Sequence, residues 1–353
     1  MYEVARRLAE RRVDVTVLVP DSTRSRLRTE ERDHVQIRRT PAWPRNRDYL
    51  WAPGIYRLLS RGEWDIVHVQ SWHTAVAPLA MIAALRASKP YLVTPHGRGY
   101  APPIRRLFRP LQRRALAPLL RRAEYVVALT EPERDGLVAE LGLEPERVRV
   151  VPNGSDLAEH LDLAHRSCAS DRTQKPVIVS PGRLERFKGH HLAIAALPHL
   201  LESYPDARLR IVGSGPYERE LRRCAAEHGV AERVTVEAYS MDERPQLAAA
   251  LATADVGVLL SEYETQPLAV LELAALGVPV VVAAAPGLRE LAAAGIARAV
   301  PAPASPGDLA KAIALALECP RNAALPQLPS WDATTADLIG LYESVLGRRL
   351  APT

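Results

Sequence analysis

Short runs of β-branched and aliphatic residues alternate with amphipathic segments along almost the whole chain. Short apolar runs bounded by turn residues are typical of strands buried on both faces, and apolar residues spaced three or four apart are typical of helices. The first half predicts strands at residues 13–19, 34–38, 65–69, 91–94, 125–129 and 148–151. A second series is predicted at residues 177–180, 209–212, 234–236, 256–260 and 278–282. Strands that alternate with helices predict an α/β fold with two parallel sheets.

The first residues of the chain have helical periodicity. Residues 2–12 lead directly into the first predicted strand, whereas an α/β domain ordinarily opens with a strand followed by a glycine-bearing turn. We therefore expect that an opening strand and its glycine-rich loop are missing ahead of Met1, because the gene-model start lies too far downstream. Such a strand is normally central, so its loss would leave a gap or an unpaired edge in the N-terminal sheet.

The length of 353 residues exceeds what one hydrophobic core usually supports, which predicts two domains. We expect an N-terminal domain at residues 1–155 and a polar linker without clear periodicity at 156–175. A second domain is expected at 176–325, followed by a C-terminal helix and tail at 326–353. The spacing of apolar residues in that tail would allow it to pack on either domain.

Charge is divided unevenly between the two halves. Residues 1–155 hold 27 Arg and Lys against 17 Asp and Glu, and the remainder holds 19 against 24. A basic half suits an anionic partner, such as a phosphorylated acceptor or lipid headgroups, and a solvated arginine-rich face is the alternative. Residues 104–122 mix arginine pairs with Leu and Phe and could lie on an anionic membrane. Pro110 and Pro118 interrupt their period, which favours a core-facing helix with an exposed arginine face.

The number and spacing of the cysteines and the length of the apolar stretches indicate in which compartment the protein is expected. The three cysteines are widely spaced and form no C-x-x-C pair, so neither a disulfide framework nor a cysteine metal site is expected. The longest apolar stretch, residues 278–285, is too short to span a bilayer. We expect a cytoplasmic protein, with any membrane contact peripheral at the inner face.

Two cations follow the first strand of the second series. Gly182 and Arg183 end that strand, and Lys188 and Gly189 follow it at the start of a helix. A helix N-terminus adds partial positive charge toward a phosphate, so this pair suits a diphosphate leaving group. The alternative is two surface cations at a helix start.

Two carboxylates, Glu264 and Glu272, precede and enter another predicted helix. Glu272 lies among small and apolar neighbours, where a carboxylate needs partners, and sugar hydroxyls can supply them. The alternative, acids that complement the helix dipole, explains Glu264 better than Glu272.

Two weaker signals accompany these residues. Gly213 and Gly215 close a strand and permit backbone to approach a ligand, although an ordinary tight turn explains them equally well. His96 follows a strand at the carboxyl edge of the first sheet, where open α/β sheets bind ligands. A structural histidine is the alternative there.

The order of these motifs resembles the retaining nucleotide-sugar glycosyltransferases of family 4 over about residues 3 to 300. The matching stretches are Ala5–Glu10 with Val15–Leu18, Asp65–His68, Thr94–Gly97, Val151–Gly154, Gly182–Arg183 with Lys188–Gly189, Gly213–Pro216 and Glu264–Glu272. The resemblance implies the GT-B architecture, in which two Rossmann-like domains with parallel sheets face each other across a cleft.

The same resemblance implies roles for single residues. Arg183 and Lys188 would hold the donor diphosphate, Glu272 the ribose, Glu264 the transferred hexose, and His96 the sugar. His96, Arg183, Lys188 and Glu264 are thus the catalytic candidates. The remaining donor-binding candidates are Gly182, Gly213, Gly215, Thr265, Gln266, Pro267 and Leu268. No metal ion and no other cofactor is expected.

The chain departs from the family pattern at two further places. Glu264-Thr-Gln-Pro267 stands where the family usually has Glu-Gly-Phe-Gly, and proline removes a backbone N–H that a ligand could use. Ala238 stands where a glycine is common after a strand, which could alter packing against the base.

The sequence therefore predicts a glycosyltransferase that moves a hexose, with retention, from a nucleotide diphosphate sugar to a glycan, a lipid-linked or a small-molecule acceptor. The alternatives are a catalytically silent sugar-nucleotide-binding protein and a nucleotide-sugar epimerase or hydrolase. No nucleic-acid partner is expected. An oxidoreductase is disfavoured because no G-x-G-x-x-G fingerprint follows the first strand.

Overall fold

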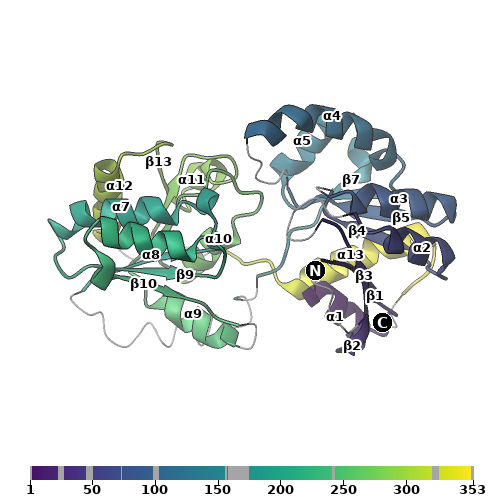
Figure 1. Ribbon diagram of the computed structural model, residues 1–353, viewed down its shortest axis with the longest axis horizontal. Helices are drawn as coiled ribbons and strands as arrows, with labels where there is room; N and C mark the ends of the chain where they lie inside the picture. The colour runs from purple at the N-terminus through teal and green to yellow at the C-terminus, as the bar shows by residue number, and fades with distance from the viewer. Residues whose placement is uncertain are drawn as a thin grey trace. The chain divides into compact units, whose positions relative to one another are not determined.

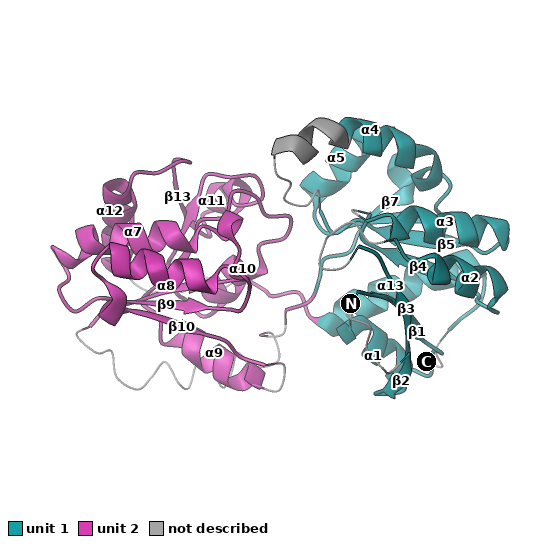
Figure 2. Cartoon of the chain, viewed as in Figure 1, with its two compact units in different colours: residues 1–153, 331–353 teal, residues 154–330 magenta. Residues whose placement is uncertain are grey.

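The chain forms two compact units in a computed structural model (Figure 2). The first unit comprises residues 1–153 and 331–353, and the second comprises residues 154–330. The structure describes residues 2–22, 28–44, 51–72, 74–97, 103–155, 157, 175–240, 243–319 and 326–350, with side chains omitted for 103–109. The expected linker at 156–175 lies outside the described residues except for Leu157 and Lys175.

The strands of the first unit form two sheets (Figure 1). One sheet has the order β1-β3-β2, with β1 (Thr16–Asp21) parallel to β3 (Val35–Pro41) and β2 (Thr29–Arg32) antiparallel to β3. The other has the order β4-β5-β6-β7 and is entirely parallel; its strands are β4 (Val67–Gln70), β5 (Tyr91–Thr94), β6 (Tyr125–Ala128) and β7 (Val148–Val150). All six predicted strands are present with shifted ends, and β2 is an addition that the apolar pattern did not predict.

Strands β1 and β4 are sheet edges among the described strands. All six residues of β1 are only half-buried, although its sequence is largely apolar. Leu18 of β1 nevertheless packs against the same core cluster as Val67 and Val69 of β4. A common core therefore supports both sheets of the first unit.

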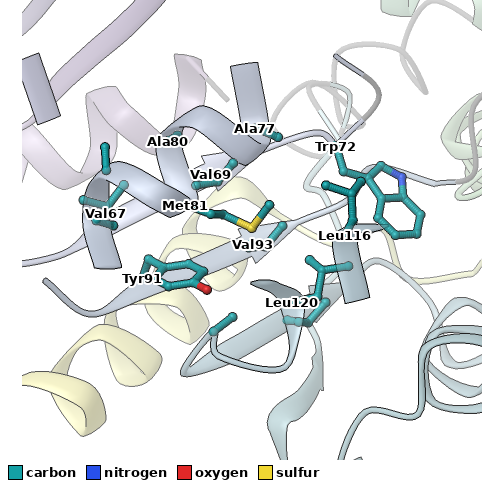
Figure 3. Packing of buried hydrophobic residues seen from close by; sticks show 14 of the residues in the cluster. Val67, Val69, Trp72, Ala77, Ala80, Met81, Tyr91, Val93, Leu116 and Leu120 are labelled. Atoms are coloured by element: carbon teal, nitrogen blue, oxygen red, sulfur yellow. The ribbon is translucent and has the colours of Figure 1, made fainter. Parts of the chain in front are cut away.

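Helices cover the two sheets of the first unit. They are α1 (Tyr2–Glu10), α2 (Pro53–Arg61), α3 (Val76–Arg86), α4 (Pro103–Leu120), α5 (Glu131–Leu141) and α13 (Trp331–Leu346), with a 3-10 turn at Pro145–Arg147. Figure 3 shows how side chains of β4, α3 and β5 interlock with Leu116 and Leu120 of α4. The C-terminal helix α13 belongs to this unit, because Leu338 and Tyr342 are buried against Leu8 of α1.

The arginine-rich segment forms helix α4 in spite of Pro110 and Pro118. Leu116 and Leu120 are buried in the core, which confirms that one face of this helix packs inward. Leu111 on the same helix is 67% exposed.

The second unit contains one parallel sheet of six strands in the order β10-β9-β8-β11-β12-β13. The strands are β8 (Val177–Pro181), β9 (Arg208–Val212), β10 (Val234–Glu237), β11 (Val256–Leu259), β12 (Val280–Ala283) and β13 (Arg298–Val300). This confirms the predicted parallel sheet, and β13 adds a short strand to it. The helices are α7 (His190–Leu201), α8 (Glu218–Glu227), α9 (Arg244–Ala252), α10 (Leu268–Ala275), α11 (Arg289–Ala293) and α12 (Pro306–Leu317), with 3-10 turns at Arg186–Lys188 and Ala231–Arg233.

The six-stranded sheet is buried on both faces. Successive residues of β8 point to opposite sides, so Ile178 lies in one apolar cluster and Val179 in the other. The strand order changes direction between β8 and β11, and ligands of open α/β sheets bind at the carboxyl ends of strands at such a point. The residues that follow β8, β9 and β11 are therefore the place to look for a site.

Candidate active site

The loops after β8 and β9 are bound to each other through backbone. Gly182 N donates to Val212 O, and Leu184 N donates to Ser214 O, each at 2.9 Å. A Cβ on Gly213, which has φ 158, would lie 1.9 Å from Gly182 O. Gly213, which was expected to let backbone approach a ligand, therefore allows the loops after β8 and β9 to contact each other.

Lys188 and Glu264 form an ion pair at the carboxyl edge of the sheet. Lys188 Nζ lies 2.6 Å from Glu264 Oε1, and only 17% and 12% of the two side chains are exposed. Ser261 Oγ donates to the same Oε1 at 2.7 Å. The structure therefore brings the turn that carries Arg183 and Lys188, here called the basic turn, into contact with the segment Glu264–Glu272, here called the acidic motif.

Arg183 lies on the same turn but faces solvent. Its side chain is 72% exposed, and its guanidinium pairs with Glu185 at 2.8 Å. The two cations of the motif thus differ: Lys188 is set against a carboxylate, and Arg183 stands at the surface.

Glu272 lies inside helix α10, where Oε1 accepts a hydrogen bond from Ser155 Oγ at 2.6 Å. Ser155 is 1% exposed. The Glu272 carboxylate, which was expected to need a partner, thus finds one for Oε1 in the hydroxyl of Ser155, 117 positions earlier in the chain.

The segment between the two carboxylates forms the start of α10. Thr265 Oγ1 lies 3.1 Å from Tyr263 OH, and Leu268 N donates to Gln266 O at 2.9 Å. Pro267 occupies the N-cap position, and its carbonyl accepts from Val270 N at 3.0 Å. The first N–H groups of a helix have no partner within the helix, so proline removes no helical hydrogen bond there.

A buried histidine that the sequence analysis missed supports the basic turn. His190 is 1% exposed; its Nδ1 accepts from Ser180 Oγ at 2.7 Å, and its Nε2 donates to Arg183 O at 3.2 Å. Burial lowers the pKa of His190 to about 4, and the positive charge of Lys188 acts in the same direction. The ring is therefore neutral at pH 7. Its position directly after Lys188-Gly189 was the available signal.

His96 lies in the first unit, at the carboxyl end of β5 as expected. Its backbone has φ 53, and its Nε2 lies 2.5 Å from Gln70 Oε1. Glu133 fastens the turn, because Oε1 accepts from Gly97 N and Oε2 accepts from Leu129 N, each at 2.7 Å. The His96 turn is thus held by the end of β4 and by the first turn of α5.

A second histidine lies beneath this turn. His68 Nδ1 is 2.7 Å from Tyr342 OH, and its Nε2 is 2.8 Å from Thr94 Oγ1. Burial lowers the pKa of His68 to about 3, and the charge of His96 acts in the same direction. Burial also raises the pKa of Tyr342, so this hydroxyl stays protonated. Helix α13 thereby supports the carboxyl edge of the first unit.

Neither a metal cluster nor a membrane span is found among the residues that the structure describes. No group of three or more His, Cys, Asp and Glu side chains there could hold a metal ion. None of the helices there is both long and apolar enough to cross a bilayer.

The two units, each built around a parallel sheet with helices on its faces, have the architecture of the GT-B class. Residues 1–159 match the model of Glycosyltransferase Family 4, and residues 166–327 match that of Glycosyl transferases group 1. The chain therefore belongs to the family 4 glycosyltransferases, which confirms the resemblance found in the sequence. It is an enzyme of nucleotide-sugar-dependent glycosyl transfer, and the silent-protein and epimerase or hydrolase alternatives are not favoured.

Curated relatives are similar along most of the chain. D-inositol 3-phosphate glycosyltransferase 1 of Catenulispora acidiphila is 28% identical, over 98% of this chain and 90% of the relative. The 2-deoxystreptamine glucosyltransferase of Streptomyces kanamyceticus is 28% identical, over 83% of this chain and 80% of the relative.

Solved structures show the same fold. Sucrose-phosphate synthase of Thermosynechococcus elongatus superposes with a TM-score of 0.72 at 21% identity, covering 98% of this chain and 92% of the other. HepE of Anabaena in complex with UDP-glucose superposes with a TM-score of 0.62 at 20% identity, covering 90% and 83%. These likenesses confirm the GT-B fold.

Proposed function

We propose that the second unit binds the donor of a retaining hexosyl transfer. Lys188 and Arg183 hold the diphosphate, Glu264 the hexose and Glu272 the ribose. The glycines at 182, 213 and 215 and residues 265–268 line the donor. The 2.6 Å contact between Lys188 and Glu264 is the observation that supports this proposal, because it joins a cation suited to a phosphate and a carboxylate suited to sugar hydroxyls.

The chemistry requires charge stabilisation at the leaving group. In the transfer, the bond from the anomeric carbon to the phosphate oxygen breaks and a bond to the acceptor oxygen forms. The acceptor proton passes to an oxygen of the leaving phosphate, so no protein nucleophile is needed. Negative charge grows on the diphosphate, and a lysine with 17% exposure stabilises it more strongly than a solvated one would.

His96 is proposed to contact the transferred sugar. The support is its position at the carboxyl end of β5 and the hydrogen bond that fixes its ring on Gln70. The donor glycosyl group is thereby recognised by polar side chains whose geometry is set before binding, which reduces the entropic cost of ordering them.

The acceptor is proposed to bind to the N-terminal domain, residues 1–155, while residues 176–325 form the donor domain. The excess of Arg and Lys in residues 1–155 suits an acceptor that carries phosphate. The similarity to a D-inositol 3-phosphate glycosyltransferase and to a 2-deoxystreptamine glucosyltransferase supports a small-molecule acceptor. Lipid-linked acceptors and glycans are the other outcomes of an acceptor screen.

Location in the cytoplasm, with peripheral contact to an anionic membrane, is a further part of the proposal. Its support is helix α4, where the exposed Leu111 and the exposed Arg114 lie within one turn of each other. Flotation with vesicles of phosphatidylcholine, with and without phosphatidylglycerol, tests it. Binding that does not depend on the anionic lipid would contradict it.

A donor screen tests the function itself. The protein is incubated with UDP-, GDP- and ADP-hexoses and a panel of polyol, phosphorylated and lipid-linked acceptors; released nucleoside diphosphate and product mass are measured. Acceptor-dependent release, with an anomeric configuration retained by NMR, is expected. Donor breakdown that no acceptor accelerates would indicate a hydrolase, and nucleotide binding without turnover would indicate a silent protein.

A further inference from the structure

Ser155 lies where the chain enters the second unit. It follows Gly154, the first residue of that unit, and it is 1% exposed. Its backbone N–H donates to Pro329 O at 2.7 Å, so it is bound to the segment by which the chain leaves the same unit. The family motif Val151–Gly154 ends one residue earlier, and no role was expected for Ser155.

The Ser155 hydroxyl makes two directed hydrogen bonds. It accepts from Leu157 N at 3.0 Å and donates to Glu272 Oε1 at 2.6 Å. A hydroxyl has one hydrogen, and that hydrogen is committed to the carboxylate. A bond of this length to an ionised oxygen is of the strong, charge-assisted kind.

The position of this hydroxyl is fixed by its surroundings. Leu157 is 1% exposed and packs in the apolar cluster formed by β8, β11 and α10. The hydrogen bonds to Leu157 and Pro329 and the burial of Ser155 leave its side chain little freedom. Helix α10, which carries Glu272, is buried against the same cluster through Val270 and Leu273.

We propose that Ser155 is a positioning residue of the donor site, which sets the rotamer of Glu272 so that its carboxylate meets the ribose hydroxyls. The inference rests on the proposed role of Glu272. It parallels the arrangement at the other carboxylate, where Ser261 Oγ donates to Glu264 Oε1 at 2.7 Å. Glu264 and Glu272 each accept a hydrogen bond from one serine hydroxyl. Ser261 is three residues from its carboxylate, whereas Ser155 is 117 residues from its own.

The test compares nucleotides with and without ribose hydroxyls. UDP, GDP and ADP are titrated by calorimetry into the full-length protein, and the tightest binder is compared with its 2′,3′-dideoxy analogue. The variants are Ser155→Ala, Ser155→Cys, which replaces the hydroxyl by a somewhat larger thiol that is a weak donor, and Ser155→Thr, which retains the hydroxyl. Ser203→Ala, at an exposed serine of the same unit, is the matched control. Thermal unfolding of each variant confirms that it is folded.

We expect Ser155→Ala to weaken binding of the ribonucleotide about tenfold and to leave the dideoxy analogue unchanged. Ser155→Thr should retain most of the preference for the ribonucleotide over the dideoxy analogue, and Ser155→Cys should resemble the alanine variant. A purely structural role would weaken both nucleotides equally, and that result would overturn the proposal. Unchanged affinities in a folded Ser155→Ala protein would overturn it as well.

Glu272→Gln separates this proposal from the proposed function. If Glu272→Gln removes the preference for ribose while Ser155→Ala does not, only the role of Ser155 is refuted. If the unaltered protein binds both nucleotides equally, the ribose role of Glu272 fails, and the role of Ser155 fails with it.

Discussion

Lys188 Nζ and Glu264 Oε1 lie 2.6 Å apart, although 76 positions separate the two residues in the chain. The sheet explains the contact, because β8 and β11 are hydrogen-bonded neighbours and their carboxyl ends emerge side by side. Each charge neutralises the other in a setting where both side chains are largely buried. In the proposed complex, the diphosphate and the hexose of the donor therefore meet the two members of one ion pair.

Replacing Lys188 by alanine should lower kcat about 10²- to 10³-fold, because one preorganised donor to the leaving group is lost. The KM for the donor should change less, since the charge develops mainly in the transition state. Steady-state kinetics with the best donor measure both constants. Lys311→Ala, at an exposed lysine of α12, is the control and should retain full activity. A Lys188→Ala enzyme with unaltered kcat would remove the lysine from the mechanism.

Gly189 is predicted to be intolerant of any side chain. Its φ is +76°, and an added Cβ would lie 2.2 Å from Leu260 O. Gly229 has a similar φ of +69° with nothing within 4 Å of the same added atom. Both alanine variants carry the left-handed backbone strain of about 1 kcal/mol, and Gly189→Ala adds a backbone clash. Urea unfolding should show that Gly189→Ala is the less stable by more than about 2 kcal/mol. Equal stabilities would mean that β11 can move away from the turn.

Glu133→Gln should loosen the His96 turn. The carboxylate accepts from Gly97 N and Leu129 N with separate oxygens, whereas an amide has a single acceptor oxygen. We expect a loss of about 1 to 2 kcal/mol in stability and faster hydrogen exchange at one of the two amides. Glu131→Gln, in the same helical turn but 63% exposed, is the control. Unchanged exchange at both amides would contradict the clamp.

Stability should fall on mild acidification because two histidines are buried in the neutral form. The pKa of His190 is lowered to about 4 and that of His68 to about 3, below the value near 6.5 of an unfolded chain. Below pH 6.5 the unfolded state therefore binds more protons, and each ring costs about 1.4 kcal/mol per pH unit until its folded pKa is reached. Urea unfolding between pH 7 and 5 measures the slope.

The slope can be assigned with two variants. His190→Asn should reduce the dependence of the free energy of unfolding on pH by the contribution of one imidazole. His199→Asn, at an exposed histidine of α7, should leave this dependence unchanged. A pH-independent free energy of unfolding between pH 7 and 5 would show that the rings are accessible to protons.

Chelation is expected to leave transfer unaffected, because the proposed mechanism assigns stabilisation of the diphosphate to Lys188 and Arg183. Initial rates are measured after dialysis against EDTA and again after addition of Mg²⁺ or Mn²⁺. A rate that is lost with EDTA and restored by either ion would assign part of that task to a metal.

Sequence reasoning reached the parallel sheets because buried strands such as Tyr91–Thr94 leave an apolar run between turn residues. It missed β2, where Thr29–Arg32 is polar and exposed and forms a strand only through its antiparallel pairing with β3. It also missed β13, which is three residues long. Neither strand carries a periodic signal of its own.

The residues of the candidate site could be predicted where they belong to a short sequence motif. Local pattern placed Lys188 at a helix start after a strand and Glu264 just before another helix, and the order of strands in the sheet brought them together. The surface position of Arg183 and the hydroxyl of Ser155 on Glu272 could not be predicted, because they depend on side-chain rotamers and on partners distant in the chain. His190 gave a signal, but a histidine at a helix start has too many explanations to be assigned without its two hydrogen bonds.

The place of helix α13 has a consequence for biosynthesis. Leu338 and Tyr342 complete an apolar cluster of the first unit, yet the ribosome makes them only after the whole of the second unit. The packing of Leu92 and Val127, which belong to this cluster, therefore stays incomplete while more than half of the polypeptide is translated. The second unit can mature during that interval, so the half of the enzyme that is made first is the half that is finished last.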